Sequence, residues 1–208
     1  DEVILPMGDA FLDLHSGGSS LNIMPSAAIE PTPDPVLRKK NIAAVLAFDA
    51  PVTVVIDNLG DTRTAMATAV RHGLVAVGTE MAGAGTVSLD ALGICRRGVR
   101  NVLAHLGVLP PTGATPKSRP EMILRIPGPE GFVLATTDGV FEPFHALGTQ
   151  VSAGQPAGRI HKLTDPSRPP EIVYYSADGI VYGRRQPGRV VPGNCCVTVA
   201  VPYEGDIA

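Results

Sequence analysis

Two short apolar runs in this sequence each end in a side chain that can take part in acid–base or metal chemistry. Residues 10–14 lead into His15, and residues 75–79 lead into Glu80. Glycines follow both side chains, so the chain can turn sharply there and let a metal or substrate approach the backbone. The runs have the length of strands, and in open α/β sheets the chemistry gathers at the carboxyl ends of strands. We therefore expect His15 and Glu80 to meet at one edge of a sheet.

Each of these side chains also has an ordinary structural interpretation. A single histidine at a strand end more often makes a structural hydrogen bond, and a catalytic zinc site needs three protein ligands. The sequence contains neither a His-x-x-Glu nor a His-Glu-x-x-His motif that would provide the others. Glu80 is either an exposed loop acid or a general base, which must come within about 2.6–3.2 Å of the proton it takes. The residues alone leave both alternatives open.

The composition limits the classes of function. The 208 residues are 44% hydrophobic and 18% charged, which predicts one large domain or two small ones with a real core. A net charge of −3 and an aromatic content of 4% argue against nucleic acid as a partner. No apolar run approaches the roughly 20 residues of a membrane span. Three cysteines without a Cys-x-x-Cys motif form no disulfide framework, which favours a cytoplasmic protein.

The first half of the chain alternates short apolar runs with helical patterns, which is typical of an α/β fold with a largely parallel sheet. The expected strands are 10–14, 51–56 and 75–80, and the expected helices are 42–48, 62–72 and a long one that begins at Thr86 or Ser88 and stops at Gly107. Residues 16–41 contain four prolines, so we expect a long irregular segment over the carboxyl edge of the sheet. Asn41 is a candidate cap for the helix that follows, and Asp61 or Thr62 for the next one.

Beyond a proline-rich linker at 109–120, the sequence predicts only strands and turns. This part also repeats itself, because residues 133–140 match residues 173–180 at an offset of 40. Two copies are too few for a solenoid, which needs at least three, and fit a small β sandwich with a pseudo-twofold axis. We therefore expect an α/β part over residues 1–108 and a β domain with an internal two-fold repeat over residues 121–208.

Four motifs together resemble the succinylglutamate desuccinylase/aspartoacylase family. They are Asp13-Leu-His-Ser-Gly-Gly, Thr79-Glu-Met-Ala-Gly-Ala-Gly, Cys95-Arg-Arg-Gly-Val-Arg-Asn-Val-Leu and Asp138-Gly-Val-Phe-Glu-Pro. The resemblance runs over nearly the whole chain and is closest to the N-acetyl-diaminobutyrate deacetylases of that family. It implies an α/β fold, in which part of a zinc-carboxypeptidase-like mixed sheet with flanking helices is followed by a small all-β barrel-sandwich domain.

The resemblance also implies roles for the two strand-end residues. His15 matches the last of three ligands of a single Zn²⁺, and Glu80 matches the glutamate that activates water for hydrolysis of an N-acyl amino acid. Zinc lowers the pKa of such a water to about 7. The family's early segment, with its His-x-x-Glu pair of zinc ligands, has no counterpart in this sequence. The chain therefore looks like the C-terminal portion of such an enzyme, and we expect it to be inactive alone.

Other candidates and alternatives concern binding. Arg63 could bind the carboxylate of a substrate through two hydrogen bonds, and Asp57 and Asn58 are similar candidates. One alternative function is a non-catalytic α/β scaffold with a β-barrel binding module. Another is a lipoyl-type carrier, although Lys162 lies in a proline-bearing loop without the usual Met-Lys pair. The expected partner is a small N-acyl amino acid rather than a nucleic acid or a membrane, and a homo-oligomer stays open.

Overall fold

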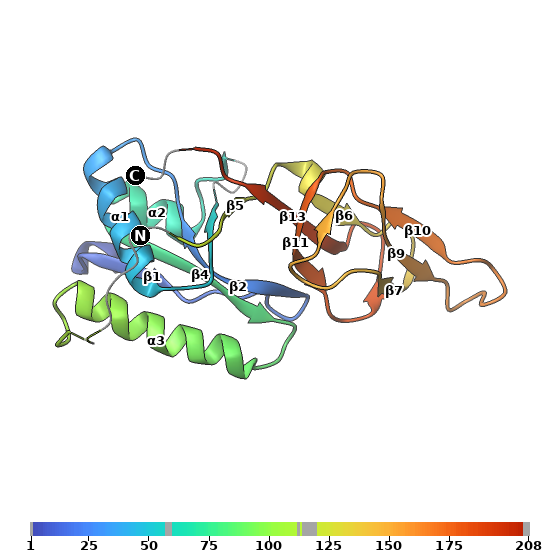
Figure 1. Cartoon of the computed structure of the whole chain (residues 1–208), viewed down its shortest axis with the longest axis horizontal. Coiled ribbons are helices and arrows are strands. Elements are labelled where there is room, and N and C mark those ends of the chain that lie inside the picture. Colours follow the sequence, from blue (N-terminus) through green and yellow to red (C-terminus); the bar gives the residue numbers. More distant parts are fainter. Residues whose placement is uncertain (1, 57–59, 112, 114–119, 206–208) are drawn as a thin grey trace.

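The chain folds as a mixed α/β protein that continues into a region of strands with one short 3-10 helix, η3 (Pro129–Gly131) (Figure 1). The computed structural model describes residues 2–56, 60–111, 113 and 120–205. The helices gather around one end of the molecule, and the last strands form the other end. No helix in the described ranges is long and apolar enough to cross a membrane.

The predicted strands of the first half are confirmed, but the sheet that they form is mixed rather than largely parallel. Its first five strands, in spatial order, are β1 (Ala10–Asp13), β4 (Val75–Gly83), β2 (Leu21–Ile29), β3 (Val52–Val55) and β5 (Ile123–Arg125). The pairs β1–β4, β2–β3 and β3–β5 are parallel, whereas β2 runs antiparallel to β4. The carboxyl end of β1 therefore lies beside the middle of β4, where Asp13 pairs with Gly78.

The expectation of an irregular segment over residues 16–41 is wrong. Nine of these residues form β2, and α1 (Pro35–Phe48) begins where the irregular segment was expected to continue. The prolines are compatible with both elements. The ladder between β2 and β4 is interrupted next to Pro25, where a missing N–H is harmless, and Pro35 occupies the first turn of the helix, where no N–H is needed.

The helices begin at different caps from those predicted, except for the last. Asp34 caps α1, Thr64 caps α2 (Ala65–Arg71), and Ser88, one of the two predicted candidates, caps α3 (Leu89–His105). Asn41 is no cap. It is buried in α1 and accepts the backbone N–H of Ala76 at 3.0 Å, which satisfies β4 where β2 does not reach it.

The two faces of β1 pack against different helices. Phe11 contacts the hydrophobic cluster that includes Met66 and Val70 of α2. Leu12 contacts the cluster that joins α1 and α3 through residues such as Phe48 and Val102. Because neighbouring side chains of a strand point to opposite faces, helices cover both sides of the sheet at this point.

In the second half, every strand pair has a counterpart in which the two repeat copies swap roles. The first copy contributes β6 (Phe132–Leu134), β7 (Gly139–Pro143), β8 (Gln150–Val151) and β9 (Pro156–His161), and the second contributes β10 (Glu171–Tyr174), β11 (Gly179–Arg185), β12 (Arg189–Val190) and β13 (Cys195–Pro202). The pair β7–β9 corresponds to β11–β13, β10–β9 to β6–β13, and β12–β7 to β8–β11. Each copy is thus completed by strands of the other.

The two halves also share one sheet. β11 pairs with β2, and β13 pairs with β5, so the strands β2, β3, β5, β13 and β11 close into a ring. The linker at 109–120 lies largely outside the described residues, and the division into two domains stays a prediction. The ring joins the second half to β2, which runs beside Glu80 of β4.

Candidate active site

The fold brings His15 and Glu80 together. Both line a pocket of about 170 Å³, and its polar lining comes from Asp13, His15, Glu30, Thr64, Thr79 and Glu80. The backbone carbonyl of His15 accepts the N–H of Met81 at 2.9 Å and the hydroxyl of Thr79 at 3.1 Å. These bonds tie the residue before the glycine turn to the two neighbours of Glu80 along β4.

The glycines that follow His15 and Glu80 allow close backbone packing, and β4 extends to Gly83 instead of ending at Glu80 as predicted. A Cβ atom at Gly17 would lie 2.2 Å from the carbonyl oxygen of Leu21, and one at Gly83 would lie 2.4 Å from the same oxygen. Gly83 also has φ +130°, which side chains rarely allow. The N–H of Gly17 donates to the carbonyl of Ala82 at 3.0 Å. The two turns are therefore packed against each other and fix the backbone of His15 relative to β4.

Glu80 is the side chain whose surroundings most clearly suit proton transfer. Burial raises its pKa to about 7, against a lowering by the charge of His15 and a smaller raising by Asp13. Its Oε2 is buried and has no hydrogen-bond partner among the described residues. A carboxyl group with a pKa near the working pH and one uncommitted oxygen can both take and return a proton.

His15 points into more open surroundings. Its side chain is 66% exposed, and Nδ1 lies 3.5 Å from Oδ1 of Asp13. A carboxylate at this position can orient an imidazole toward a metal. Within the described part of the chain, however, no three histidine, cysteine or acidic side chains are grouped so that they could hold a metal ion. The described residues therefore do not form a zinc site by themselves.

The sequence analysis missed Glu30, the third acidic side chain of the pocket. It follows β2 directly and is 9% exposed. The signal was present, because the apolar run 27–29 ends in Glu30 as the run 75–79 leads into Glu80. The prolines on either side concealed it.

The second half also contributes a residue beside the pocket. The hydroxyl of Tyr182 in β11 lies 2.6 Å from Oγ of Ser26, and both side chains are buried. Ser26 is the register partner of Glu80 across β2 and β4. Burial raises the pKa of Tyr182 above its usual range, so the hydroxyl stays protonated. A side chain 156 residues away from Ser26 was beyond any local sequence pattern.

The structure does not bring Arg63 into the His15–Glu80 pocket. Its guanidinium donates to both carboxylate oxygens of Asp61, at 2.9 and 2.8 Å, and is largely exposed. It lines a separate hollow together with Phe11 and Arg71. The other two candidates, Asp57 and Asn58, lie outside the described residues.

A second group of polar side chains lies in the second half of the chain, and none of them lines this pocket. The carboxylate of Glu142 accepts two hydrogen bonds from Arg159, at 2.8 and 3.0 Å, and lies 2.7 Å from Nε2 of His161. We call these three residues the Glu142 cluster. His145 instead bonds the hydroxyl of Tyr175 at 3.1 Å.

Comparison with known proteins identifies the family. Residues 3–106 match the sequence model of the succinylglutamate desuccinylase/aspartoacylase catalytic domain. The chain belongs to this family. Over 203 residues it is 33% identical to the N-alpha-acetyl-L-2,4-diaminobutyric acid deacetylase of Halomonas elongata, a match that covers 97% of this chain and 59% of the relative. The family expected from the motifs is thus confirmed.

Solved structures agree with this assignment. The succinylglutamate desuccinylase/aspartoacylase of Rhodobacter sphaeroides is 35% identical with a TM-score of 0.85, covering 98% of this chain and 61% of that one. The product-bound ectoine utilization protein EutE (DoeB) of Ruegeria pomeroyi is 34% identical with a TM-score of 0.86, covering 96% and 60%. The chain therefore spans about three fifths of the length of these relatives.

Proposed function

We propose that the His15–Glu80 pocket is part of the active site of a zinc-dependent amidohydrolase that removes the acyl group from an N-acyl amino acid. The family is one of deacylases, and the Halomonas relative is by name a deacetylase of an acetylated diamino acid. We extend that substrate class to this chain as a deacetylase or desuccinylase type of reaction, which cleaves a linear amide C–N bond.

The observation that carries this proposal is the state of Glu80. Its carboxyl group is buried, has a pKa raised to about 7, and holds one oxygen without a partner among the described residues. Glu80 takes a proton from a water molecule as the water oxygen bonds to the acyl carbon. The C–N bond then breaks, and the same carboxyl group passes the proton to the leaving amine.

The metal part of the proposal needs more than this pocket provides. His15 would contribute one imidazole nitrogen, with Asp13 at 3.5 Å as its orienting carboxylate. The described residues offer no group of three metal-binding side chains. We propose that the missing ligands come from polypeptide not represented among these 208 residues, and that the 208-residue chain alone is therefore inactive. Arg63 stays a proposal for carboxylate binding, and it would first have to leave Asp61.

A chimera tests the function directly. In this chimera the matched 59% of the Halomonas deacetylase is replaced by the present chain. We expect it to bind one zinc per chain and to release amine from N-acetyl-diaminobutyrate or another member of an acetyl- and succinyl-amino acid panel. The 208-residue chain alone should do neither.

Two results would contradict the proposal. Full activity of the chain alone with stoichiometric zinc would show that no further ligands are needed. A chimera that folds and binds zinc but cleaves no member of the panel would favour the non-catalytic scaffold instead.

A further inference from the structure

The pocket that contains Glu80 extends along β2 and β4 to a second glutamate, Glu30. The register of the two strands places Ser26 opposite Glu80 and Ala28 opposite Gly78. Glu30 therefore lies four residues further along the chain than the partner of Glu80, which corresponds to roughly 14 Å of extended strand. This separation is long enough for an amide group beside Glu80 and a short side chain that ends at Glu30.

The two glutamates belong to the same face of the sheet. Side chains alternate along a strand, so Glu30 shares one face of β2 with Ala28 and Ser26. The ladder still holds the backbone here, because the N–H of Ile56 donates to the carbonyl of Ile29 at 3.0 Å. A Cβ atom at Gly78 would lie 3.1 Å from Cβ of Ala28, which places Gly78, and Glu80 two residues on, on this face as well.

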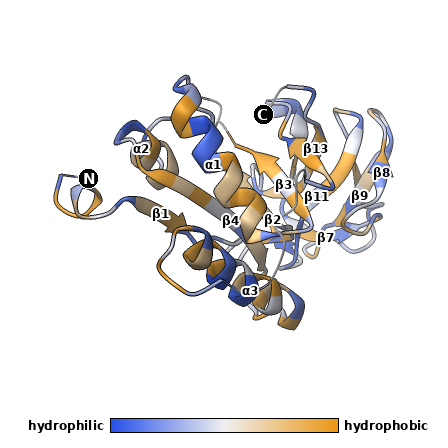
Figure 2. Ribbon diagram, turned by 60° about the vertical axis from the view of Figure 1, so that its left-hand side comes forward, coloured by the Kyte–Doolittle hydropathy of each residue, from blue (hydrophilic) through white to orange (hydrophobic). Residues whose placement is uncertain are grey.

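Between the two glutamates the pocket has a floor of small residues and a cover of apolar ones. Ala28 and Gly78 form the floor, and a Cβ atom at Gly78 would also lie 3.3 Å from Cε of Met66, a buried residue of α2. Figure 2 shows β4 and β2 next to each other, with α2 beside β4. Ile29 and Ile56 add apolar walls. This stretch of the pocket therefore suits methylene groups.

The charged groups of the pocket favour a cation. Of the described residues that line it, Asp13, Glu30 and Glu80 are acidic, His15 is the one basic side chain, and none is a lysine or an arginine. Glu30 is 9% exposed, and charges attract each other more strongly in such surroundings than in water. A carboxylate can accept about four hydrogen bonds, so Glu30 can bind a ligand in addition to its contacts within the protein.

We propose that Glu30 determines the specificity of this pocket by binding an ammonium group on the side chain of the amino acid that the reaction releases. The methylene groups of that side chain lie over Ala28 and Gly78 and below Met66. The acetyl and succinyl groups of the proposed reaction are neutral and acidic, so the cation must belong to the amino acid. The inference rests on the proposed function, because it takes Glu80 as the reacting end of the pocket.

Substrate pairs that differ in one group test this role in the chimera. N-acetyl-2-aminobutyrate has the carbon skeleton of N-acetyl-2,4-diaminobutyrate but lacks the side-chain amine, and N-acetylglutamate carries an acid instead. The diamino substrate should be preferred over both. Glu30→Gln should reduce its preference over the aminobutyrate derivative, measured as a ratio of kcat/KM values, by about 10- to 100-fold, the range of one charge-assisted hydrogen bond. A ratio within one variant does not depend on the fraction of protein that is folded.

A shorter carboxylate should change the preferred length of the substrate. Glu30→Asp withdraws the carboxylate by one methylene group, so the preference should move from the diaminobutyrate derivative to N-acetylornithine, whose side chain is one methylene group longer. If Glu30 only stabilised the fold, Glu30→Gln and Glu30→Asp would lower kcat/KM for every substrate by the same factor. That result would overturn the inference.

A binding experiment on the 208-residue protein separates this inference from the proposed function. The probes are 2,4-diaminobutyrate and 2-aminobutyrate, titrated into the protein and followed by NMR. The diamino acid should bind at least about tenfold more tightly, and Glu30→Gln but not Glu142→Gln should abolish the difference. If the chimera is inactive, this titration decides: a preference that depends on Glu30 contradicts only the proposed function. No preference for the diamino acid, or one that Glu30→Gln leaves unchanged, overturns the role of Glu30.

Discussion

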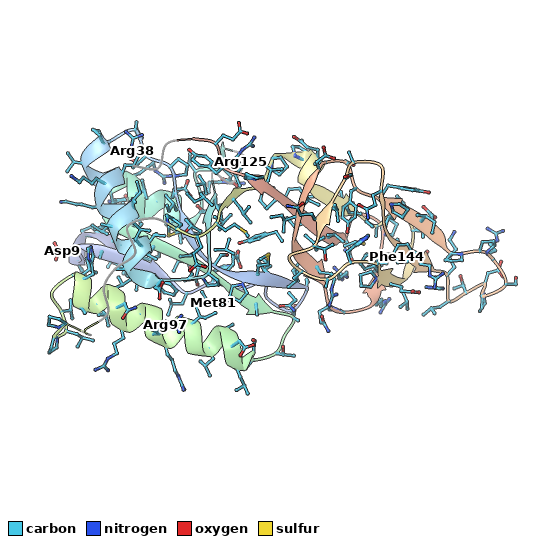
Figure 3. All side chains as sticks on the ribbon, viewed as in Figure 1. Asp9, Arg38, Met81, Arg97, Arg125 and Phe144 are labelled. Atoms are coloured by element: carbon cyan, nitrogen blue, oxygen red, sulfur yellow. The ribbon has the colours of Figure 1, made fainter. Side chains whose placement is uncertain are left out.

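The pocket around Glu80 and the Glu142 cluster each place a glutamate near a histidine, but the two glutamates differ in burial, hydrogen bonding and pKa. Figure 3 shows Met81, the neighbour of Glu80 in the sequence, on the sheet beside the helices and Phe144 among the strands of the second half. Glu80 is partly buried, its Oε2 has no hydrogen-bond partner among the described residues, and its pKa is raised to about 7. Hydrogen bonds from Arg159 and His161 lower the pKa of the exposed Glu142 to about 2. The first carboxyl group is prepared for proton transfer, whereas the second is held ionised.

The repeat makes this contrast more informative. At the offset of 40 that relates the two copies, Glu142 of β7 corresponds to Tyr182 of β11. In the first copy this position forms an exposed ion pair with Arg159. In the second copy the side chain at this position, Tyr182, forms a hydrogen bond with Ser26, which lies opposite Glu80. Equivalent places in the fold thus have different uses, because β11 pairs with β2 whereas β7 pairs with β9 and β12.

The largest expected effect on activity is that of replacing Glu80, compared with the same replacement of Glu142. In the chimera, Glu80→Gln should lower kcat/KM for the amide substrate by at least about 100-fold, which is the usual contribution of a general base. Glu142→Gln should change it by less than about twofold, because surface ion pairs contribute little. Steady-state kinetics on both variants, with zinc content measured alongside, would test this difference. Equal losses in the two variants would remove the functional distinction between the regions.

The pH dependence of stability should have opposite signs at the two sites. Folding raises the pKa of Glu80 from 4.5 to about 7, so its contribution is fully present below about pH 4.5 and is lost as the pH rises through 7. This amounts to about 3 kcal/mol of the free energy of unfolding. Folding lowers the pKa of Glu142 from 4.5 to about 2, so its contribution is present above 4.5 and is lost as the pH falls toward 2.

Urea denaturation as a function of pH would measure both trends. Glu80→Gln should make the protein more stable than the unmodified chain at about pH 8 and remove the fall in stability between about pH 4.5 and 7. Glu142→Gln should leave that fall unchanged and act only at acidic pH. If Glu80→Gln destabilised the protein at about pH 8, the raised pKa of Glu80 would be wrong.

The contrast also explains what the sequence could and could not predict. His15 and Glu80 were found because apolar runs of the sequence lead into them, although β4 continues past Glu80 to Gly83. Ser88 was one of two candidates for the start of a strong amphipathic pattern. These signals are local. β2 was missed because Pro25 is normally excluded from a central strand, and only the interrupted ladder next to it makes the proline acceptable. Glu30, which follows that strand, was lost with it.

The properties that distinguish Glu80 from Glu142 depend on distant parts of the chain. Ser26 lies opposite Glu80 in the sheet and is buried against the hydroxyl of Tyr182 from β11. Glu142 finds its partners on the adjacent strand β9. No local sequence pattern predicts whether a carboxyl group will be buried or will form an ion pair with an arginine. The family resemblance was therefore needed to choose between an exposed loop acid and a general base for Glu80.

The smallest predicted effect is the difference between two tyrosine substitutions, Tyr182→Phe beside the pocket and Tyr175→Phe away from it. Tyr182→Phe removes the hydroxyl that bonds Ser26 and leaves a buried Oγ without its partner, which should cost about 1–2 kcal/mol of stability. Tyr175→Phe removes a comparable bond to His145 and serves as the matched control. Both variants should unfold at lower urea concentration, but only Tyr182→Phe should lower kcat/KM in the chimera, because only Ser26 adjoins Glu80. The double variant with Ser26→Ala should recover about 1 kcal/mol, since no unpaired hydroxyl then remains. An equal loss of activity in both tyrosine variants would mean that the second half acts on the pocket through general stability rather than through this hydrogen bond.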